Sequence, residues 1–325
     1  MVNLALIGVG NWGKNYIATC KKLPNIRIKY LCASSKKNLQ GFTGDYVKTT
    51  NYKELFNYSD IDVVIIATPN ATHPEISAEF LKKGYNVLVE KPLSEDYRKA
   101  LKLLPLKKNR GKLQVGHVYL FDPAYIKTKE LVKNMEKIRY IDYEGTSYGL
   151  LRKNTSVLWD IGSHAVSLIL DIAQSDPKTI SAWGNNLLYP KSKFYDTASL
   201  KIDFEEGISA FIQLNWLFPE KRRKLIVTGE KDSVLYDAEA EKKVVFYKDI
   251  IPDKDLHIRY QGAKVSFPTY DAATPLENEI NEFVNAINKK QAITYSGLDL
   301  GIKVTKLLTL AERSIAQKGK AMNVV

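Results

Sequence analysis

The first third of the chain alternates between short apolar runs and segments with helical spacing. The opening run, residues 4–7, is apolar at every position, which predicts a fully buried strand. The run stops at Gly8, and Trp12, Tyr16 and Cys20 then recur every four residues, which predicts a helix with one buried face. The same reasoning predicts strands at 26–32, 47–49, 61–67, 86–90 and 113–116 and helices at 52–58, 74–83 and 95–104. This alternation indicates a parallel sheet that is covered on both faces.

After residue 118 the rhythm changes, because strands follow one another with only short polar turns between them. The predicted strands are 136–148, 197–204, 208–216, 224–228, 233–236 and 244–247, and the predicted helices are 158–172, 275–288 and 298–316. Residues 249–271 show no clear pattern. Consecutive strands of this kind indicate an antiparallel meander with one covered face. The sequence therefore predicts an α/β protein with a doubly wound parallel sheet in residues 1–118 and an α+β domain with a mostly antiparallel open sheet in residues 119–325.

Length and composition narrow the class of protein. A chain of 325 residues with 45% hydrophobic content is long enough for two globular domains. No apolar run approaches the roughly 20 residues that span a bilayer, and the first strand starts too early for a signal peptide. We therefore expect a cytoplasmic protein without a membrane partner. Two cysteines and four histidines are scattered without metal-ligand spacing, which predicts buried reduced thiols and no metal site.

The net charge of +12 raises the question of nucleic-acid binding. The lysines are spread along the chain and form no basic stripe with interleaved aromatic residues, so we expect no nucleic-acid partner. A solvated basic surface is the simpler interpretation. Such a surface also attracts anionic small molecules, including dinucleotides and sugar nucleotides.

The turn after the first strand contains Gly8, Gly10 and Gly13 in the pattern G-x-G-x-x-G. In dinucleotide-binding folds the first glycine allows a tight turn, the second lets the backbone approach a pyrophosphate, and the third lets helix and strand pack closely. Asn11 and Trp12 begin the helix, whose N–H groups and positive dipole end attract phosphate. The alternative is a glycine-rich turn without a ligand. With a strand before it and a helix after it, the motif favours a bound dinucleotide.

The end of the second strand bears on the choice of cofactor. NAD sites usually carry an acidic residue about 20 residues after the glycines, where it binds the ribose 2′-hydroxyl. Here the segment 32–37 reads Cys-Ala-Ser-Ser-Lys-Lys and holds no acid. Ser34, Ser35 and Lys36 are suited to bind and neutralise a 2′-phosphate. NADP is therefore favoured, NAD is the alternative cofactor, and an ordinary polar turn is the structural alternative.

Two further groups of residues suit hydride-transfer chemistry. Lys91 directly follows the strand at 86–90, where an ammonium can stabilise a developing alkoxide. Asp160 and His164 are four residues apart on a predicted helix, so the carboxylate can orient the imidazole and also cap the helix. Histidine titrates near neutral pH and suits a base that takes a hydroxyl proton. Taken singly, each group also has a structural interpretation: a surface lysine before a turn proline, and a capping aspartate with a half-buried histidine.

In this order the motifs resemble one family nearly end to end. Gly8–Gly13, Asp160–His164 and the segments 67–73 (Ala-Thr-Pro-Asn-Ala-Thr-His), 90–92 (Glu-Lys-Pro) and 116–123 (Gly-His-Val-Tyr-Leu-Phe-Asp-Pro) are similar to the Gfo/Idh/MocA oxidoreductases, named for glucose–fructose oxidoreductase and inositol dehydrogenase. The resemblance implies a Rossmann domain that binds NAD(P) and a second domain whose open sheet forms the substrate site. It implies that His164 is the general acid and base, that Lys91 polarises the reacting oxygen, and that Asp160 orients both. It also implies a cis bond before Pro92 and cofactor contacts from Thr68, Pro69, Asn70, His73, Glu90 and Lys91.

The resemblance includes one departure. Many members carry Asp three residues after the histidine, where this chain has Ser167, and this leaves the substrate open. The segments 10–15 and 157–160 are most similar to the branch linked to surface polysaccharides and nucleotide sugars. Arg152 and Lys153 are then candidates for a phosphate or carboxylate contact, and Tyr119 and Phe121 for the walls of a sugar pocket. Ordinary surface charge and core packing are the alternatives for these four residues.

The sequence thus predicts an NAD(P)-dependent oxidoreductase that moves a hydride between nicotinamide and a secondary carbon of a sugar or nucleotide sugar. We expect it to form a homo-oligomer, either a dimer or a tetramer. The alternatives are a redox-assisted glycosidase of the same family and a non-catalytic protein that senses NAD(P). The presence of Lys91, Asp160 and His164 counts against a sensor, because sensing needs no proton relay.

Overall fold

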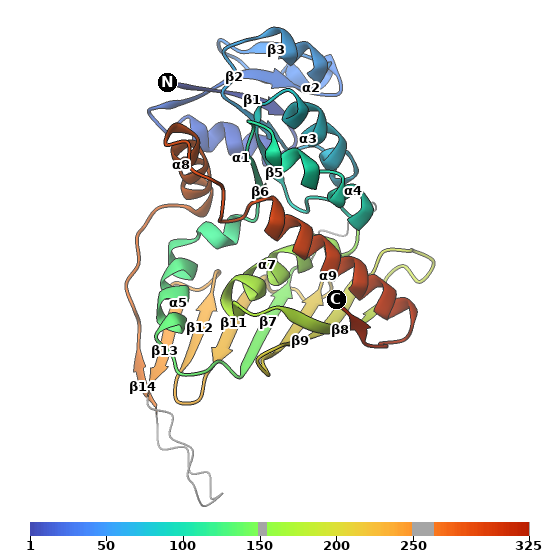
Figure 1. Cartoon of the computed structure of the whole chain (residues 1–325), viewed down its shortest axis with the longest axis vertical. Helices are drawn as coiled ribbons and strands as arrows, with labels where there is room; N and C mark the ends of the chain where they lie inside the picture. Colours follow the sequence, from blue (N-terminus) through green and yellow to red (C-terminus); the bar gives the residue numbers. More distant parts are fainter. Residues whose placement is uncertain (149–154, 249–262, 325) are drawn as a thin grey trace, which may run out of the picture. The chain divides into compact units, whose positions relative to one another are not determined.

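The computed structural model describes residues 1–148, 155–248 and 263–324, which fall into two compact units (Figure 1). Unit 1 contains Met1–Val118 and Thr274–Thr305, and unit 2 contains Tyr119–Ala273 and Lys306–Val325. The first boundary lies after residue 118, where the sequence pattern changes. The predicted second domain, 119–325, does not coincide with one compact unit, because the chain returns to unit 1 before it ends.

Within the described residues, unit 1 is built on a parallel sheet of six strands in the order β3-β2-β1-β4-β5-β6. The strand order reverses between β1 and β4, and sheets of this type bind ligands beyond the carboxyl ends of the strands at such a point. The strands are β1 (Val2–Ile7), β2 (Ile26–Cys32), β3 (Val47–Thr49), β4 (Val63–Ile66), β5 (Asn86–Glu90) and β6 (Leu113–Gly116).

The side chains of β1 alternate between two hydrophobic cores. Leu4 and Leu6 pack in a core with α1 (Asn11–Cys20) and α8 (Pro275–Asn288), whereas Ala5 and Ile7 pack in a core with α3 (His73–Lys82). Unit 1 also contains α2 (Lys36–Leu39), α4 (Tyr97–Leu101) and the 3-10 helices η1 (Tyr52–Asn57), η2 (Asn70–Thr72) and η3 (Leu104–Lys108). The sheet is therefore covered on both faces, as the alternation along the sequence predicts.

Both cysteines are buried free thiols, one in each of these cores. Burial raises the pKa of Cys20 to about 12 and that of Cys32 to about 11, so neither forms a reactive thiolate near neutral pH. The prediction of buried reduced thiols is confirmed.

The sheet of unit 2 contains nine strands in the described ranges, in the order β14-β13-β12-β11-β7-β10-β9-β8-β15. Neighbouring strands are antiparallel except β7 and β10, which run parallel. The sheet is mostly antiparallel, as predicted, but β7 separates β10 from β11 and splits the expected meander in two. The strands are β7 (Tyr140–Thr146), β8 (Pro177–Asn185), β9 (Thr197–Phe204), β10 (Ser209–Asn215), β11 (Arg222–Thr228), β12 (Ser233–Asp237), β13 (Val244–Lys248), β14 (Lys264–Ser266) and β15 (Met322–Asn323).

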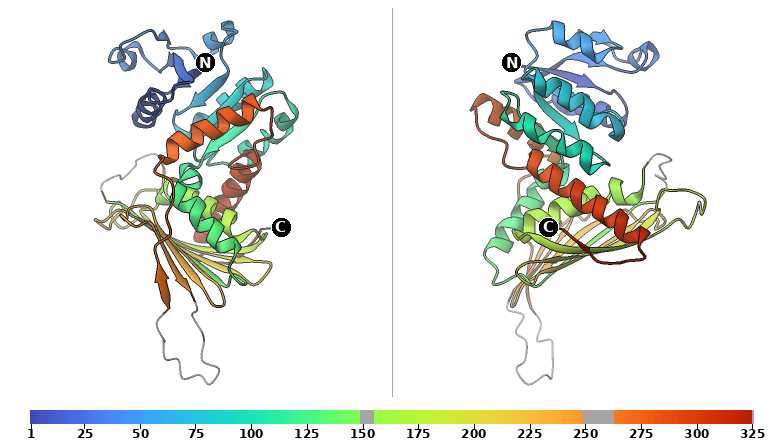
Figure 2. Two further views of the ribbon diagram at one scale, coloured as in Figure 1. Left: turned by 90° about the vertical axis from the view of Figure 1, so that its left-hand side faces the viewer. Right: turned by 45° about the vertical axis from the view of Figure 1, so that its right-hand side comes forward.

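Among the described residues, helices cover one face of this sheet and leave the other face open (Figure 2). In β9 every second residue from Ala198 to Phe204 is buried, which marks the covered face. The helices of unit 2 are α5 (Pro123–Lys133), which follows the 3-10 helix η4 (Val118–Phe121), α6 (Val157–Asp160), α7 (Gly162–Ala173) and the later turns of α9 (Leu298–Ala316). In the described part of the chain, no helix combines the length and the apolar character that crossing a bilayer requires.

Candidate active site

The turn after β1 has the geometry that its glycines predict. Gly8 has a φ of +98°, which favours glycine, and a Cβ there would lie 2.3 Å from the Ala67 carbonyl oxygen. A Cβ on Gly13 would lie 2.1 Å from the Gly8 carbonyl oxygen, so α1 packs directly against the turn. Gly10, by contrast, has no atom within 4 Å of its Cβ position. Gly10 is also the N-cap of α1, and no side chain caps the N–H groups of the first turn, which contains Asn11 and Trp12.

These distances predict different outcomes for two alanine substitutions. Gly13→Ala is expected to destabilise the protein by about 1–3 kcal/mol, because the new methyl group overlaps backbone atoms that cannot move independently. Gly10→Ala is expected to fold almost normally and to weaken dinucleotide binding, because its methyl group enters open space. Thermal unfolding and cofactor titration of both variants measure the two effects. Equal stability of the two variants would contradict the packing argument.

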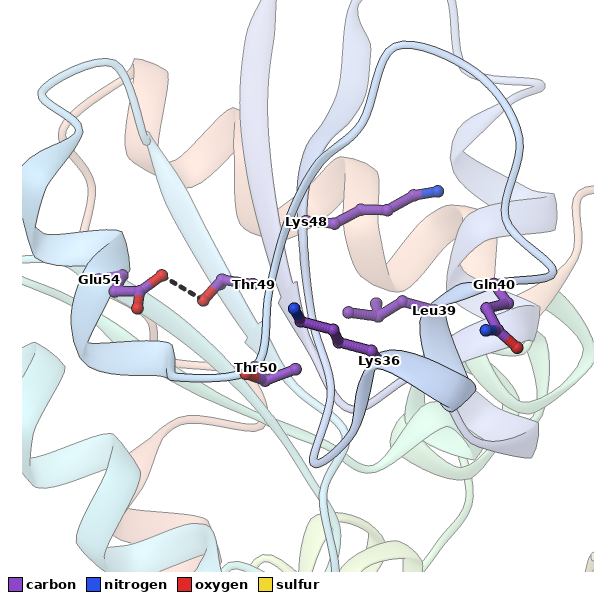
Figure 3. Close-up of a pocket in the computed structure, with 7 residues that line it drawn as sticks. All are labelled: Lys36, Leu39, Gln40, Lys48, Thr49, Thr50 and Glu54. Carbon is purple, nitrogen blue, oxygen red and sulfur yellow. Dashed lines mark hydrogen bonds between the residues drawn. The ribbon is translucent and has the colours of Figure 1, made fainter.

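Residues of α2, of β3 and of the segment after β3 line a pocket of about 430 Å³ in unit 1 (Figure 3). Lys36, the first residue of α2, extends into this pocket, and the Thr49 hydroxyl donates a hydrogen bond of 2.6 Å to Glu54 at its side. Ser35 caps α2, because its hydroxyl accepts the backbone N–H of Asn38, and Ser34 accepts a hydrogen bond from the Asn38 side chain. The pocket is lined by Lys36, Leu39, Gln40, Lys48, Thr49, Thr50 and Glu54. Of the three residues predicted for a 2′-phosphate, Lys36 lines the pocket, and the two serines organise the helix that carries it.

The loop after β4 is fixed by its own side chains. Thr72 donates to the Pro69 carbonyl oxygen, and Thr68 lies 2.7 Å from Thr72, so Thr68 donates to Thr72. Asn70 donates a hydrogen bond of 2.9 Å to Glu95. These contacts hold Thr68, Pro69 and Asn70 rigidly beyond the carboxyl end of β4, where cofactors of this sheet type bind.

His73 is fully buried and connects the ends of two strands. Its ring nitrogens lie 2.9 Å from the Pro92 carbonyl oxygen and 2.8 Å from the Thr68 carbonyl oxygen. Burial lowers the pKa of His73 more than these two carbonyl groups raise it. Because both ring nitrogens lie against backbone carbonyl oxygens, His73 holds the loops after β4 and β5 together, and its contact with a cofactor stays a prediction.

Lys91 lies immediately beyond β5 and is buried, as is Glu90 before it. One oxygen of the Glu90 carboxylate accepts a hydrogen bond of 2.9 Å from the Tyr16 hydroxyl, and the other accepts one of 3.2 Å from the Lys91 backbone N–H. The Lys91–Pro92 peptide bond is cis, as the family resemblance implies. Glu90 therefore fixes the backbone from which the Lys91 side chain extends.

A second buried carboxyl group, Glu279 on α8, shares the Tyr16 hydroxyl with Glu90. Its Oε2 lies 3.4 Å from the Tyr16 oxygen, and its Oε1 has no hydrogen-bond partner in the described part of the chain. The Tyr16 hydroxyl donates mainly to the nearer acceptor, Glu90, and its hydrogen bond to Glu279 is long. Burial first, and the charge of Glu90 second, raise the pKa of Glu279 well above its usual value, which favours the protonated form of its carboxyl group.

His117 lies at the end of β6, and its tautomer follows from its neighbours. The Ser296 hydroxyl donates to the Val115 carbonyl oxygen, so the His117 Nδ1–H donates to the Ser296 oxygen over 3.0 Å. The buried Nε2 is then an unprotonated acceptor, and it has no partner among the described residues. Burial and the charge of Lys91 lower the pKa of His117 to about 3, so this acceptor persists at physiological pH.

In unit 2, Asp160 and His164 lie on two consecutive helices instead of the single predicted one. Asp160 is the last residue of α6, Ile161 separates the two helices, and His164 lies in the first turn of α7. The expectation that Asp160 caps the helix is wrong, because Ile161 occupies the N-cap position of α7. Val157, Leu158 and Trp159 are buried apolar residues, and they form a separate helical turn, α6, before α7 begins. Asp160 and His164 are both buried, and Lys91 belongs to unit 1.

The predicted substrate contacts have different surroundings. The Tyr119 ring packs edge-on against the His164 ring with 4.8 Å between the centroids, so Tyr119 is a neighbour of the candidate base. Phe121 is fully buried in the core. Arg152 and Lys153 lie outside the described residues.

Comparison with known proteins identifies the family. Residues 2–117 match an oxidoreductase family with an NAD-binding Rossmann fold, and residues 139–235 match the GFO/IDH/MocA C-terminal domain. A crystallised oxidoreductase candidate from Magnetospirillum magnetotacticum MS-1 is 30% identical, with a TM-score of 0.82 over 95% of this chain and 99% of that chain. The chain belongs to the Gfo/Idh/MocA oxidoreductase family.

Two other proteins are similar over nearly the whole chain. The inositol 2-dehydrogenase of Rhizobium meliloti (strain 1021) is 24% identical over 98% of both proteins. The UDP-N-acetylglucosamine 3-dehydrogenase GnnA of Acidithiobacillus ferrooxidans is 18% identical, with a TM-score of 0.84 over 97% of both chains. At 18% identity, the similarity to GnnA demonstrates a shared fold.

The residue that departs from the common Gfo/Idh/MocA pattern, Ser167, is buried on α7. Its hydroxyl donates a hydrogen bond of 2.8 Å to the His164 carbonyl oxygen, one turn earlier in the helix. Ser167 therefore binds the backbone of His164, whereas an aspartate at the same position would carry a charge into this core.

Three polar residues of the site, Tyr16, His117 and Glu279, were not singled out from the sequence. Glu279 had a detectable signal, because Leu276, Ile280 and Phe283 predict the buried face of α8 and Glu279 falls on that face. Tyr16 was assigned to the buried face of α1, but periodicity gives no hint that its hydroxyl binds two carboxyl groups. His117 lies inside the motif 116–123, yet its partner Ser296 is distant in sequence.

Proposed function

We propose that this protein transfers a hydride between NADP(H), or NAD(H), and a secondary carbon of a sugar or nucleotide sugar. The observation that carries the proposal is the buried Lys91, which directly follows a strand of an NAD-binding Rossmann domain and whose backbone is held by Glu90. An ammonium at this edge is suited to bind the oxygen of a reacting carbonyl or hydroxyl group. The names of the two enzymatic relatives, which act on an inositol and on a UDP-sugar, support a polyhydroxylated substrate.

The residues around the first turn fit a dinucleotide. Gly10 leaves open space for a pyrophosphate, and the uncapped first turn of α1 offers N–H donors to it. Thr68, Pro69, Asn70 and Glu90 would surround the ribose and nicotinamide. When bound, the nicotinamide supplies the hydride donor or acceptor of the reaction.

We assign each candidate catalytic side chain a separate task. His164 takes the hydroxyl proton of the sugar during oxidation and returns it during reduction. Lys91 donates a hydrogen bond to the same oxygen and stabilises negative charge that develops on it. Asp160, which precedes His164 by four residues, holds the imidazole in position and stabilises its charged form.

The pocket beside α2 supports NADP over NAD as the preferred cofactor. Lys36 brings a positive charge to it, and segment 32–37 contains no acidic residue that would bind a 2′-hydroxyl. Glu54 also lines the pocket, but the Thr49 hydroxyl already donates to it.

Cofactor preference is tested with two neighbouring lysines. Lys36→Ala is expected to weaken NADPH binding by about tenfold and to change NADH binding little, because one charge-assisted hydrogen bond to the 2′-phosphate is lost. Lys37→Ala removes the same charge from an exposed neighbour that does not line the pocket, and serves as the control. Fluorescence titration with both cofactors measures the change. Tighter binding of NADH than of NADPH by the unaltered protein would overturn the preference for NADP.

The overall proposal is tested by a substrate screen. The purified full chain is incubated with NADP or NAD and a panel of free sugars, inositols and nucleotide sugars, and cofactor absorbance is followed in both directions. Turnover of at least one compound is expected. Cofactor binding without turnover of any compound would instead favour the sensing alternative.

A further inference from the structure

Arg223 on β11 is a buried charge that forms no ion pair with a carboxylate within the described residues. Its side chain is 8% exposed, and its Nη1 donates to the backbone carbonyl oxygens of Thr146 (2.7 Å) and Arg222 (2.6 Å). Its Nε is buried and has no hydrogen-bond partner among those residues. The preceding residue, Arg222, is oriented to the other face of the strand and forms ion pairs with Glu144 and Glu220. The charge of Arg222 is therefore paired with carboxylates, whereas the charge of Arg223 is not paired with any among the described residues.

A second unsatisfied polar group lies beside Arg223 on the covered face of the sheet. In the pairing of β7 with β11, Gly145 is opposite Arg223 and Tyr143 is opposite Leu225, so Tyr143 and Arg223 are diagonal neighbours. The Tyr143 hydroxyl is buried and has no hydrogen-bond partner in the described part of the chain. Burial raises the pKa of Tyr143, and the nearby positive charge of Arg223 acts in the opposite direction.

The same two residues lie next to the candidate acid–base group of unit 2. Gly145 has no side chain, and Ile161, which directly follows Asp160, packs against it: a Cβ on Gly145 would lie 2.5 Å from the Ile161 Cγ2. Tyr119, whose ring contacts His164, is also close enough to Tyr143 to influence its pKa. The turn between α6 and α7 therefore packs against β7 at Gly145, the residue opposite Arg223.

We propose that Arg223, assisted by the Tyr143 hydroxyl, binds an anionic group of the substrate, either a carboxylate or a phosphate. This inference rests on the proposed function, because it names the substrate class of the same site: an acidic sugar or a sugar phosphate rather than a neutral polyol. A guanidinium presents N–H donors in one plane, which match the oxygens of carboxylate and phosphate. Burial of a charge without a counter-ion is unfavourable, and a ligand anion would supply the missing partner.

The experiment compares two arginine variants of the full-length protein. Arg223→Met and Arg222→Met remove the same charge from adjacent positions on opposite faces of β11. Isothermal titration calorimetry, with and without reduced cofactor, measures the affinity for D-glucuronate as the carboxylate probe and UDP-N-acetylglucosamine as the diphosphate probe. D-glucose and myo-inositol serve as uncharged probes. The two anionic probes distinguish which anion the site takes.

The unaltered protein is expected to bind at least one anionic probe about tenfold or more tightly than either neutral probe. Arg223→Met is expected to weaken that binding by about tenfold to a hundredfold, as for loss of a charge-assisted hydrogen bond, whereas Arg222→Met changes it less than about twofold. The thermal midpoint of ligand-free Arg223→Met is expected to equal or exceed that of the unaltered protein, because an uncompensated buried charge has been removed. If this variant fails to fold, Arg223→Lys keeps the charge without the planar donors and is expected to lose about tenfold in the same measurement.

Equal affinity for anionic and neutral probes, or equal losses in the two variants, would overturn the inference. A lower thermal midpoint of Arg223→Met together with unchanged anion affinity would show that Arg223 is a structural residue. These readouts need no turnover, so they are separate from the proposed function. Dinucleotide binding and sugar oxidation without anion preference would refute only the role of Arg223. Anion binding that depends on Arg223, without any dinucleotide binding, would refute only the proposed function.

Discussion

His164→Ala is expected to lower the turnover number for the proposed sugar oxidation by about a hundredfold or more, because no other group would take the hydroxyl proton. His164 is buried in the first turn of α7, against the Tyr119 ring. The dinucleotide is expected to bind the variant normally, since its proposed contacts lie in unit 1. Steady-state assays on a substrate found in the screen, together with cofactor titration, measure the two quantities.

Ser163→Ala is the matched control in the same helical turn. The Ser163 hydroxyl donates to the Asp160 backbone carbonyl oxygen, and its removal is expected to change turnover less than about twofold. A near-normal rate in His164→Ala would refute the role of His164 as the base. A large loss of turnover in both variants would instead indicate that the substitutions damage the fold of α7.

Glu279→Gln is expected to stabilise the protein increasingly as the pH rises above about 4.5. The pKa of Glu279 is raised in the folded state, so the folded protein keeps a proton that the unfolded chain releases above the ordinary glutamate pKa. The unaltered protein therefore loses about 1.4 kcal/mol of stability per pH unit from this group, until the folded pKa is reached. Glutamine resembles the protonated acid, donates to Tyr16 and has no proton to release. Denaturant unfolding of both proteins at pH 4.5 and pH 8 measures the difference.

Glu277→Gln, on the same helix, is expected to change the stability of the protein in the opposite direction: it destabilises the folded state as the pH rises. Glu277 accepts the Thr274 backbone N–H in a capping box, and this contact lowers the pKa of its carboxyl group. Its stabilisation is present above the ordinary glutamate pKa, so the glutamine variant loses stability at neutral pH and little at acidic pH. Infrared difference spectra at pH 8 give an independent check, because a protonated carboxyl band should be lost in Glu279→Gln only. Absence of that band in the unaltered protein would show that Glu279 is ionised.

Much of the architecture follows from periodicity in the sequence. The helices Pro275–Asn288 and Leu298–Ala316 begin and end where the apolar spacing predicts, because each buries one continuous stripe. The parallel sheet is predictable because its strands alternate with helices along the sequence. The insertion of β7 between β10 and β11 does not follow, since alternation fixes which face of a strand is buried but not which strand is its neighbour. The strand Pro177–Asn185 has only two fully buried apolar residues, so the apolar pattern does not predict it.

The candidate site was predictable where short motifs carry it and hidden where distant residues complete it. Gly8, Gly13 and Lys91 occur in contiguous segments whose local geometry is recognisable. The proton on Glu279 depends on Tyr16 and Glu90, which are separated from it by most of the chain. The surroundings of Arg223 were hidden in this way, because nothing in the sequence indicates that it forms no ion pair within the described residues while Arg222 forms two.

The return of α8 to the first unit has a consequence for the order of events during synthesis. Leu276, Ile280, Phe283 and Val284 complete the core that begins with Leu4 and Leu6. A ribosome that has released only the first 118 residues has therefore made all six strands of this sheet, while one of its sides still exposes an apolar strip. The first 118 residues cannot complete this core until α8 has been translated, so their apolar strip stays open to aggregation while the intervening chain is made.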